Sequence, residues 1–223
     1  MRHFDMEMNE LKSRLVNMTG LVEQMIRSSI EQLVKRDPKV VDTIKGLEKE
    51  VNIEDIVLDD KCLKLIALNQ PVGADLRFLT AAMRITSDLE RMGDEAVNIS
   101  EMAMDLLEYP QLKPLIDIPK MASLVENMVT SCIKAFNESD AELAREVLAK
   151  DDEVDALKDK VIEDLKEYMI KSSEPSTIQC AVDLMFVAKS IERIGDHATN
   201  ICEDIIFMIH GKDIRHPRLF SGK

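Results

Sequence analysis

Pairs of carboxylates spaced four residues apart are the feature of this sequence best suited to chemistry. Glu90 and Asp94 form one pair, and Glu192 and Asp196 form another 102 residues later. Residues four apart in a helix lie one turn above each other on the same face, so each pair would present adjacent carboxylates. The amides that extend the two rows by one more turn are Asn98 and Asn200. Oxygen donors in such rows are suited to binding metal ions.

A second set of acidic rows precedes these pairs along the chain. Asp55 and Asp59 are four apart, Asp155 and Asp159 repeat that spacing, and Glu163 follows one turn later. Two carboxylates about 6 Å apart repel each other by about 1 to 3 kcal/mol at effective dielectric constants between water and a protein surface. A bound cation would offset this repulsion. We therefore expect one metal site in each half, with candidate ligands Asp55, Asp59, Glu90, Asp94, Asp155, Asp159, Glu192 and Asp196.

The ligand types indicate which metals to expect. Carboxylates and amides without nearby thiolates favour hard divalent or trivalent cations, so Mg, Mn, Ca or Fe is expected and Zn is less indicated. His197 is the only imidazole next to a cluster. A ferritin-like di-iron enzyme would need Glu-x-x-His pairs on two helices, and the sequence contains none. Arg91 and Arg193, which follow the first acid of each pair, are expected to neutralise the rows through surface ion pairs.

Solvent exposure alone is the alternative explanation of the acidic rows, because exposed helix faces are usually charged. Against it, the row occurs twice with a glycine, Gly93 or Gly195, one position before the second acid. A glycine inside a helix costs ~1 kcal/mol relative to alanine, which suggests that another helix must approach closely at these positions. A metal-free acidic surface stays the alternative to a metal site.

An internal repeat surrounds these rows. Residues 90–101 recur as residues 192–203, with eight of the twelve positions identical. The apolar residues around each copy follow a 3-4 spacing, which is typical of a long helix that packs along one seam. In the first copy these residues are Phe78, Ala82, Ile85, Leu89, Met92, Ala96, Ile99, Ala103 and Leu106. The second copy has the same spacing, so we predict one such helix in each half.

Helix-ending residues divide each half into three helices. Asp37-Pro38 and Pro71 separate those of the first half, whereas a capping-box-like segment at 139–142 and Pro175 separate those of the second. Three antiparallel helices can bury one another's apolar faces. The prediction is an all-α fold of two tandem three-helix bundles with six long antiparallel helices. Its boundaries are a first bundle at 1–110, a linker at 111–119, a second bundle at 120–212 and a loose tail at 213–223.

The composition excludes several classes of partner. The chain has 42 Asp and Glu against 29 Lys and Arg, a net charge of −13, and such a surface repels nucleic acid and anionic lipids. No stretch approaches the ~18 apolar residues of a membrane span, and the N-terminus lacks the apolar run of a signal peptide. The four cysteines are dispersed, which favours buried, reduced thiols. We expect a cytoplasmic protein that reaches a membrane only through its partners.

The most specific motifs are the doubled Glu-Arg-hydrophobic-Gly-Asp block and the segment Gln70-Pro71-Val72-Gly73-Ala74-Asp75-Leu76-Arg77. Both are similar to motifs of the PhoU family, which accompanies phosphate-specific transport systems. The resemblance covers nearly the whole chain. It implies metal clusters held by acid-x-x-x-Asp motifs on the second and third helices of each bundle. The positions concerned are Asp55, Asp59, Glu90 and Asp94 in the first bundle, and Glu192 and Asp196 in the second.

The second half departs from that pattern. An alignment of the second helices of the two bundles pairs Val51 with Val154. The same alignment pairs Asp55 with Lys158 and Asp59 with Ile162. The second cluster must therefore use Asp155 and Asp159, or be incomplete.

The resemblance also implies a role. PhoU-like proteins are negative regulators of phosphate uptake and of the phosphate-starvation response, and they connect a phosphate ABC transporter ATPase to a sensor histidine kinase. A homodimer is expected from the same resemblance. The sequence lacks a nucleophile-base constellation, so no enzymatic activity is expected. The alternatives are a metal-free helical adaptor and, less favoured, a metal-dependent phosphohydrolase.

Overall fold

Helices account for every regular element in residues 3–172 and 174–214, the part of the chain that the computed structural model describes. The first unit comprises α1 (His3–Lys35), α2 (Val41–Asn69) and α3 (Ala74–Asp105). The second unit comprises α4 (Asp117–Glu138), α5 (Ala141–Leu148), α6 (Asp151–Lys171) and α7 (Pro175–His210). The two short 3-10 helices are η1 (Pro38–Val40) and η2 (Leu106–Glu108). The predicted fold of two three-helix bundles is confirmed, with α5 and α6 together in the place of one predicted helix.

Local sequence explains most of the turns. The Asp37 carboxylate accepts a hydrogen bond from the backbone N–H of Lys39 at 3.0 Å and thereby caps η1. Before α5, the cap is Asp140, whose carboxylate accepts from two backbone N–H groups. Ser139 instead ends α4 in the left-handed conformation, with φ of 53°. The predicted capping box at 139–142 is therefore wrong: the N-cap is Asp140, and Leu143 stands where a capping box needs Glu or Gln.

The segment between the units is held to the first of them. The guanidinium of Arg36, at the end of α1, donates to the carbonyl oxygens of Leu106 and Tyr109 at 2.7 and 2.6 Å. The connection then runs to Asp117, where α4 begins, two residues before the predicted end of the linker. Residues 215–223, most of the predicted tail, lie outside the described residues.

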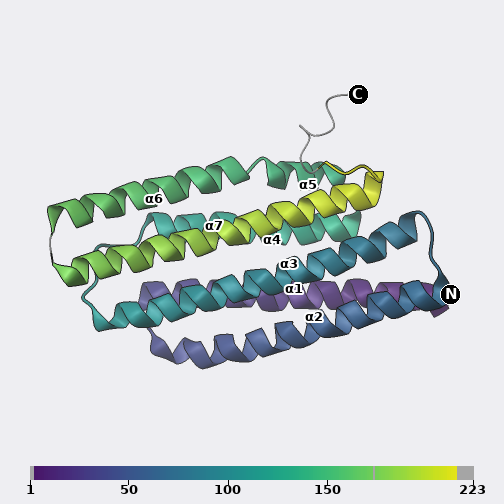
Figure 1. The fold of residues 1–223 in the computed structure, drawn as a ribbon, viewed down its shortest axis with the longest axis horizontal. Helices are drawn as coiled ribbons and strands as arrows, with labels where there is room; N and C mark the ends of the chain where they lie inside the picture. The colour runs from purple at the N-terminus through teal and green to yellow at the C-terminus, as the bar shows by residue number, and fades with distance from the viewer. Residues whose placement is uncertain (1–2, 173, 215–223) are drawn as a thin grey trace.

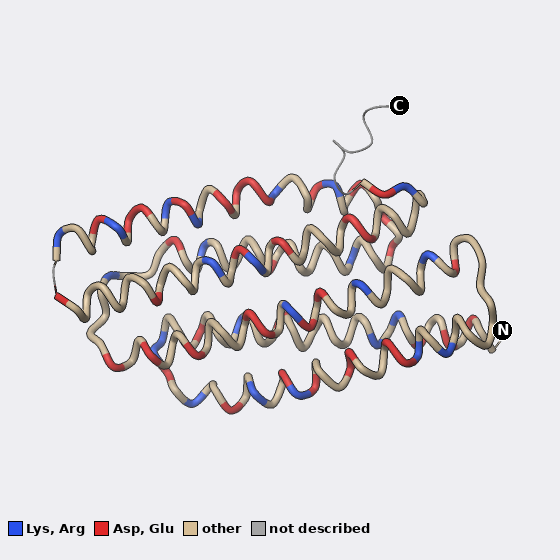
Figure 2. Tube along the Cα trace, viewed as in Figure 1, with Lys and Arg blue, Asp and Glu red and all other residues tan. Residues whose placement is uncertain are grey.

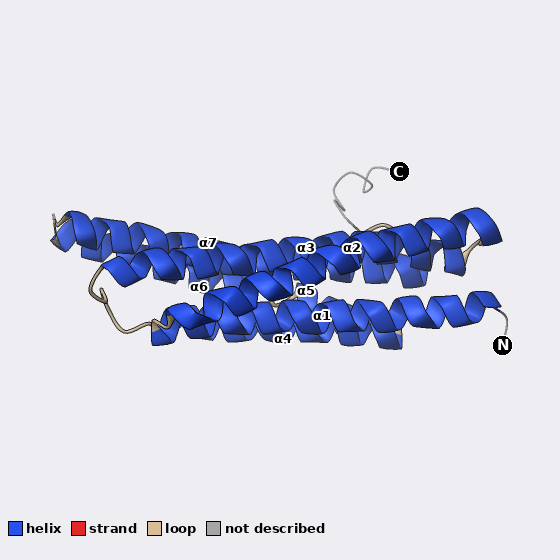
Figure 3. Cartoon of the chain, turned by 90° about the horizontal axis from the view of Figure 1, so that it is seen from below, coloured by secondary structure: helices blue, strands red, loops and turns tan. Residues whose placement is uncertain are grey.

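The two units lie side by side, with α3 and α7 next to each other along the middle of the molecule (Figure 1). Figure 3 shows α3 and α7 in one layer and α1 and α4 in a second layer. In Figure 1, α2 and α6 lie on the outer sides of the first and second units. None of the described helices is long and apolar enough to cross a membrane.

One continuous apolar core extends through both units. Its side chains come from the predicted stripes, and Met18, Met25, Met92 and Met121 are fully buried in it. Each apolar side chain buried in this way contributes roughly 1.5–3 kcal/mol relative to exposure to water. The four cysteines are buried and free, as predicted.

Two helix glycines mark equivalent crossings of the helices. A Cβ atom added to Gly93 would lie 3.6 Å from Val51 Cγ1, and one added to Gly195 would lie 3.5 Å from Val154 Cγ1. The helices do approach at these points, but both distances are ordinary van der Waals contacts. The expected close approach is therefore present, although it leaves room for a Cβ atom at both positions. The two crossings show that α2 meets α3 in the same register in which α6 meets α7.

Charged pairs connect α3 to α7. Arg84 Nη1 lies 2.8 Å from Asp204 Oδ1, and His197 Nδ1 lies 2.8 Å from Asp88 Oδ1. Arg193 Nη1 lies 2.7 Å from Glu95 Oε1. Residue numbers rise along α3 as they fall along α7, so the helices are antiparallel. The three carboxylate residues are buried. Arg193 thus pairs with the other unit, which corrects the expectation that it neutralises the acidic row of its own helix.

The substitution Arg193→Met should lower the free energy of unfolding by about 1 to 3 kcal/mol at pH 7, because it leaves the buried Glu95 carboxylate without its cation. Urea denaturation measures the change. The double variant Arg193→Met/Glu95→Gln should recover much of the lost free energy of unfolding. If Arg193→Met lowers the free energy of unfolding equally in the parent and in Glu95→Gln, the assigned pairing is contradicted. The control Arg145→Met removes an exposed arginine of α5 and should have little effect.

Candidate metal-binding site

The facing sides of α2 and α3 bring acidic side chains together. Burial raises the pKa of Glu90, and the negative charges of Asp94, Asp55 and Glu48 raise it further. These three carboxylates therefore lie close enough to Glu90 to act on it electrostatically. Figure 2 shows acidic positions along adjacent stretches of α2 and α3. We refer to Glu48, Asp55, Asp59, Glu90 and Asp94 as the first acidic cluster.

The side chains of this cluster are partly buried, and the positive charge of Arg91 only partly offsets the effect by lowering the pKa of Glu90. Burial raises the pKa of both Asp55 and Asp59, and the Asp59 charge adds to the effect on Asp55. The Oδ1 atom of Asp59 is buried and has no hydrogen-bond partner. Leaving a buried acceptor unsatisfied costs about 1–3 kcal/mol, more for a charged group.

The first acidic cluster supplies only oxygen donors. Burial and the neighbouring Asp59 raise the pKa of the Cys62 thiol to about 12, so without a metal the thiol stays protonated. In the described part of the chain, none of the ion pairs involves Asp55, Asp59, Glu90 or Asp94. An oxygen-only donor set with an orphaned buried oxygen fits a hard cation.

The side chains of the first acidic cluster do not converge on one point in this structure. Among the described residues, no three His, Cys, Asp or Glu side chains are gathered closely enough to hold a metal ion. Binding would require them to rotate toward one another, and a cation would remove the repulsion that opposes this rotation.

The second unit brings together another acidic group, which contains its own cation. Its carboxylates are Asp151, Asp155, Glu192 and Asp196, and we refer to them as the second acidic cluster. Burial raises the pKa of Asp196 to about 6. The negative charges of Glu192, Asp151 and Asp155 add to this rise, and that of Glu192 adds most. The Lys158 ammonium lies 2.7 Å from Asp155 Oδ1 and 3.0 Å from Glu192 Oε1. These ion pairs raise the pKa of Lys158, so this cluster already contains a cation of its own.

The remaining predicted ligand, Asp159, lies at the edge of this group. Its side chain is 77% exposed and 3.8 Å from the Lys158 ammonium, and it is not among the charges that raise the pKa of Asp196. Two contributors were missed in the sequence, Glu48 and Asp151. Both stand four residues before another polar residue of the same helix, Asn52 and Asp155 respectively, so the same spacing could have revealed them.

Comparison with known families identifies the fold. The PhoU domain matches two segments of the chain, residues 15–103 and residues 118–205. The first segment falls in the first unit and the second in the second unit. The chain belongs to the PhoU family.

PhoU relatives align with almost the full length of the chain. It is 36% identical over 213 residues to the phosphate-specific transport system accessory protein PhoU homolog of Aquifex aeolicus, with 96% of each protein covered. It is 31% identical over 219 residues to the homolog of Pseudomonas putida, with 98% of this chain and 85% of that protein covered.

Solved PhoU structures have the same architecture. The crystal structure of PhoU from Pseudomonas aeruginosa has a TM-score of 0.88 and 30% identity, and the match covers 94% of this chain and 100% of that one. The structure of the phosphate transport system regulatory protein PhoU from Streptococcus pneumoniae has a TM-score of 0.86 at 24% identity, covering 95% and 99%. The latter likeness supports the fold alone.

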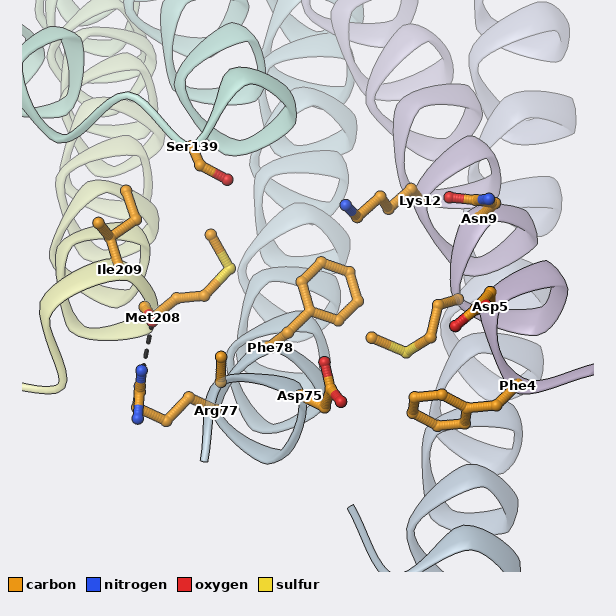
Figure 4. Close-up of a pocket in the computed structure, with 12 residues that line it drawn as sticks. Phe4, Asp5, Asn9, Lys12, Asp75, Arg77, Phe78, Ser139, Met208 and Ile209 are labelled. Atoms are coloured by element: carbon orange, nitrogen blue, oxygen red, sulfur yellow. Dashed lines mark hydrogen bonds between the residues drawn. The ribbon is translucent and has the colours of Figure 1, made fainter. Parts of the chain in front are cut away.

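The other PhoU motif, which ends at Arg77, connects the two units. It lines a cavity of about 390 Å³ at one end of the molecule. Figure 4 shows Phe78 toward the middle of this cavity, between Met208 of α7 and Phe4 of α1. The Arg77 Nε atom donates to the Met208 carbonyl oxygen at 3.1 Å, and the guanidinium also lies against Gly211. Arg77 thus ties the start of α3 to the end of α7.

The substitution Asp196→Asn should raise the melting temperature at pH 8 but not near pH 4. Folding raises the pKa of Asp196 to about 6, so this residue favours the folded state at low pH and loses that contribution as the pH rises through 6. The neutral amide avoids the loss. Circular-dichroism melts in chelator between pH 4 and pH 8 test this, with exposed Glu101→Gln as the control. A difference between variant and parent that does not depend on pH would contradict the assignment.

Proposed function

We propose that this protein is the accessory protein of a phosphate-specific transport system and a negative regulator of phosphate uptake and phosphate-starvation signalling. In this role it contacts the transporter ATPase and a sensor histidine kinase in the cytoplasm, forms a homodimer, and acts by binding rather than by catalysis. The observation that carries the proposal is the pair of PhoU domains, one in each unit, together with full-length relatives that bear this name.

An exposed apolar surface on α2 supports binding to other proteins. Its side chains are Ile53, Ile56, Leu63 and Leu68, with exposures of 59%, 69%, 56% and 81%. Spacings of three and seven residues place Ile53, Ile56 and Leu63 on one side of the helix, whereas Leu68 is turned about 140° from Leu63. Large apolar side chains that gather on a surface mark interaction sites. We propose that this face of α2 contacts one of the protein partners.

We also propose that the first acidic cluster binds a divalent or trivalent cation. Asp55, Asp59, Glu90 and Asp94 would hold it, and Glu48 adds negative charge nearby. The ligand chemistry favours Mg, Mn, Ca or Fe. The bound cation would supply positive charge between α2 and α3, offset the carboxylate repulsion and connect the two helices. The orphaned Asp59 oxygen and the absence of ion pairs at the four proposed ligands within the described residues support this site.

Expression of this protein should lower phosphate uptake and a phosphate-starvation reporter in a bacterium that lacks its own PhoU but contains the cognate transporter and kinase. Ile56→Glu should weaken partner binding by roughly fivefold or more, because it places a charge in an apolar contact. Pull-down of the ATPase and the kinase measures this. The control is Ile170→Glu, which changes an isoleucine of α6 that is 84% exposed, against 69% for Ile56. Unchanged uptake and reporter activity, with the protein present, would contradict the proposed function.

Elemental analysis of protein purified without chelator should find metal, and Glu90→Gln with Asp94→Asn should strongly reduce the metal-to-protein ratio. The matched control is Glu101→Gln with Asp105→Asn, which removes another pair of carboxylates four residues apart on α3. A ratio near zero in the parent, or an equal ratio in all three proteins, would rule out the proposed site.

A further inference from the structure

Lys158 differs from the other lysines of α6 in where its ammonium lies. It makes ion pairs with Asp155 on its own helix and with Glu192 on α7, and its side chain is only 19% exposed. The other three lysines of α6, Lys160, Lys166 and Lys171, are 64%, 56% and 71% exposed, and of these three only Lys160 pairs with another helix, through Asp117 of α4. The Lys158 ammonium is therefore held between α6 and α7, inside the second acidic cluster, rather than in solvent.

The corresponding position in the first unit carries the opposite charge. Val51 packs at Gly93 in the first unit as Val154 packs at Gly195 in the second, so the two valines are structurally equivalent. Four residues after these valines, one helical turn onward, stand Asp55 and Lys158. An acid that faces Glu90 in the first unit is thus replaced by a base that faces Glu192 in the second.

A second exchange removes another oxygen donor. Eight residues after the equivalent valines stand Asp59 in the first unit and Ile162 in the second. Ile162 lines an apolar hollow of about 420 Å³ together with Met185 and Phe186, and Lys158 lies at its edge. The second unit has therefore lost two carboxylates of the first unit's pattern and gained a cation.

We propose that Lys158 is the built-in counter-cation of the second acidic cluster and closes it to divalent metal ions, so that only the first unit binds metal. A tethered ammonium need not be recruited from solution, and it repels a second cation that approaches the same carboxylates. The packing of α6 against α7 is then independent of metal supply, whereas that of α2 against α3 responds to it. The claim that the first unit binds metal rests on the proposed function. The claim about Lys158 does not.

Exchanging the two residues tests the inference, with Mn²⁺ as the probe. Each protein is stripped with EDTA and reloaded, its Mn²⁺ content is measured by mass spectrometry, and its melting temperature is recorded in EDTA and in Mn²⁺. Lys158→Asp should bind additional Mn²⁺ in the second unit, which binds none in the parent, because the repelling ammonium is gone. Asp55→Lys should lose the Mn²⁺ of the first unit. The control Lys166→Asp makes the same charge change on α6 and should resemble the parent.

A milder variant covers the case in which Lys158→Asp fails to fold. Lys158→Gln should melt below the parent in EDTA and recover in Mn²⁺. The inference is overturned if Lys158→Gln melts like the parent in EDTA, if a folded Lys158→Asp gains no Mn²⁺, or if Glu192→Gln removes Mn²⁺ from the parent. A parent that binds no Mn²⁺ would refute the first-unit site, while these variants would still decide the role of Lys158.

Discussion

The register in which the helices of each unit pack determines where the carboxylates of this protein lie. Val51 at Gly93 marks the register of α2 on α3, and Val154 at Gly195 marks the same register of α6 on α7. Once the register is set, residues one turn away on each helix come to the same level. The acids are brought together by apolar burial, which contributes more than their mutual repulsion costs.

The two units deal with this repulsion differently. In the first acidic cluster no ion pair is present at the four proposed ligands within the described chain, and a buried oxygen of Asp59 lacks a partner. In the second, the ammonium of Lys158 pairs with carboxylates from two helices. One helical scaffold therefore carries two charge arrangements, and the difference follows from single residues at equivalent positions.

The spacing of apolar residues along the chain explains which parts of the fold could be predicted from the sequence. The long helices, the repeat and the buried stripes follow from residue spacing, and the alignment of Val51 with Val154 already set Lys158 opposite Asp55. The break between α5 and α6 could not be predicted, because Lys150 precedes α6 without a side-chain cap. Nor could the pairing of Arg193 with Glu95, since periodicity shows which face a residue occupies but not which residue of a distant helix lies opposite it.

The continuous core has a consequence for how the protein unfolds. Because α3 and α7 bury their apolar faces against each other, neither half has a complete interior of its own. A single half would leave the inner face of α3 or α7 open to water and prone to aggregation. The duplicated sequence thus specifies two units that share one interior, and each unit depends on the other to cover its inner helix.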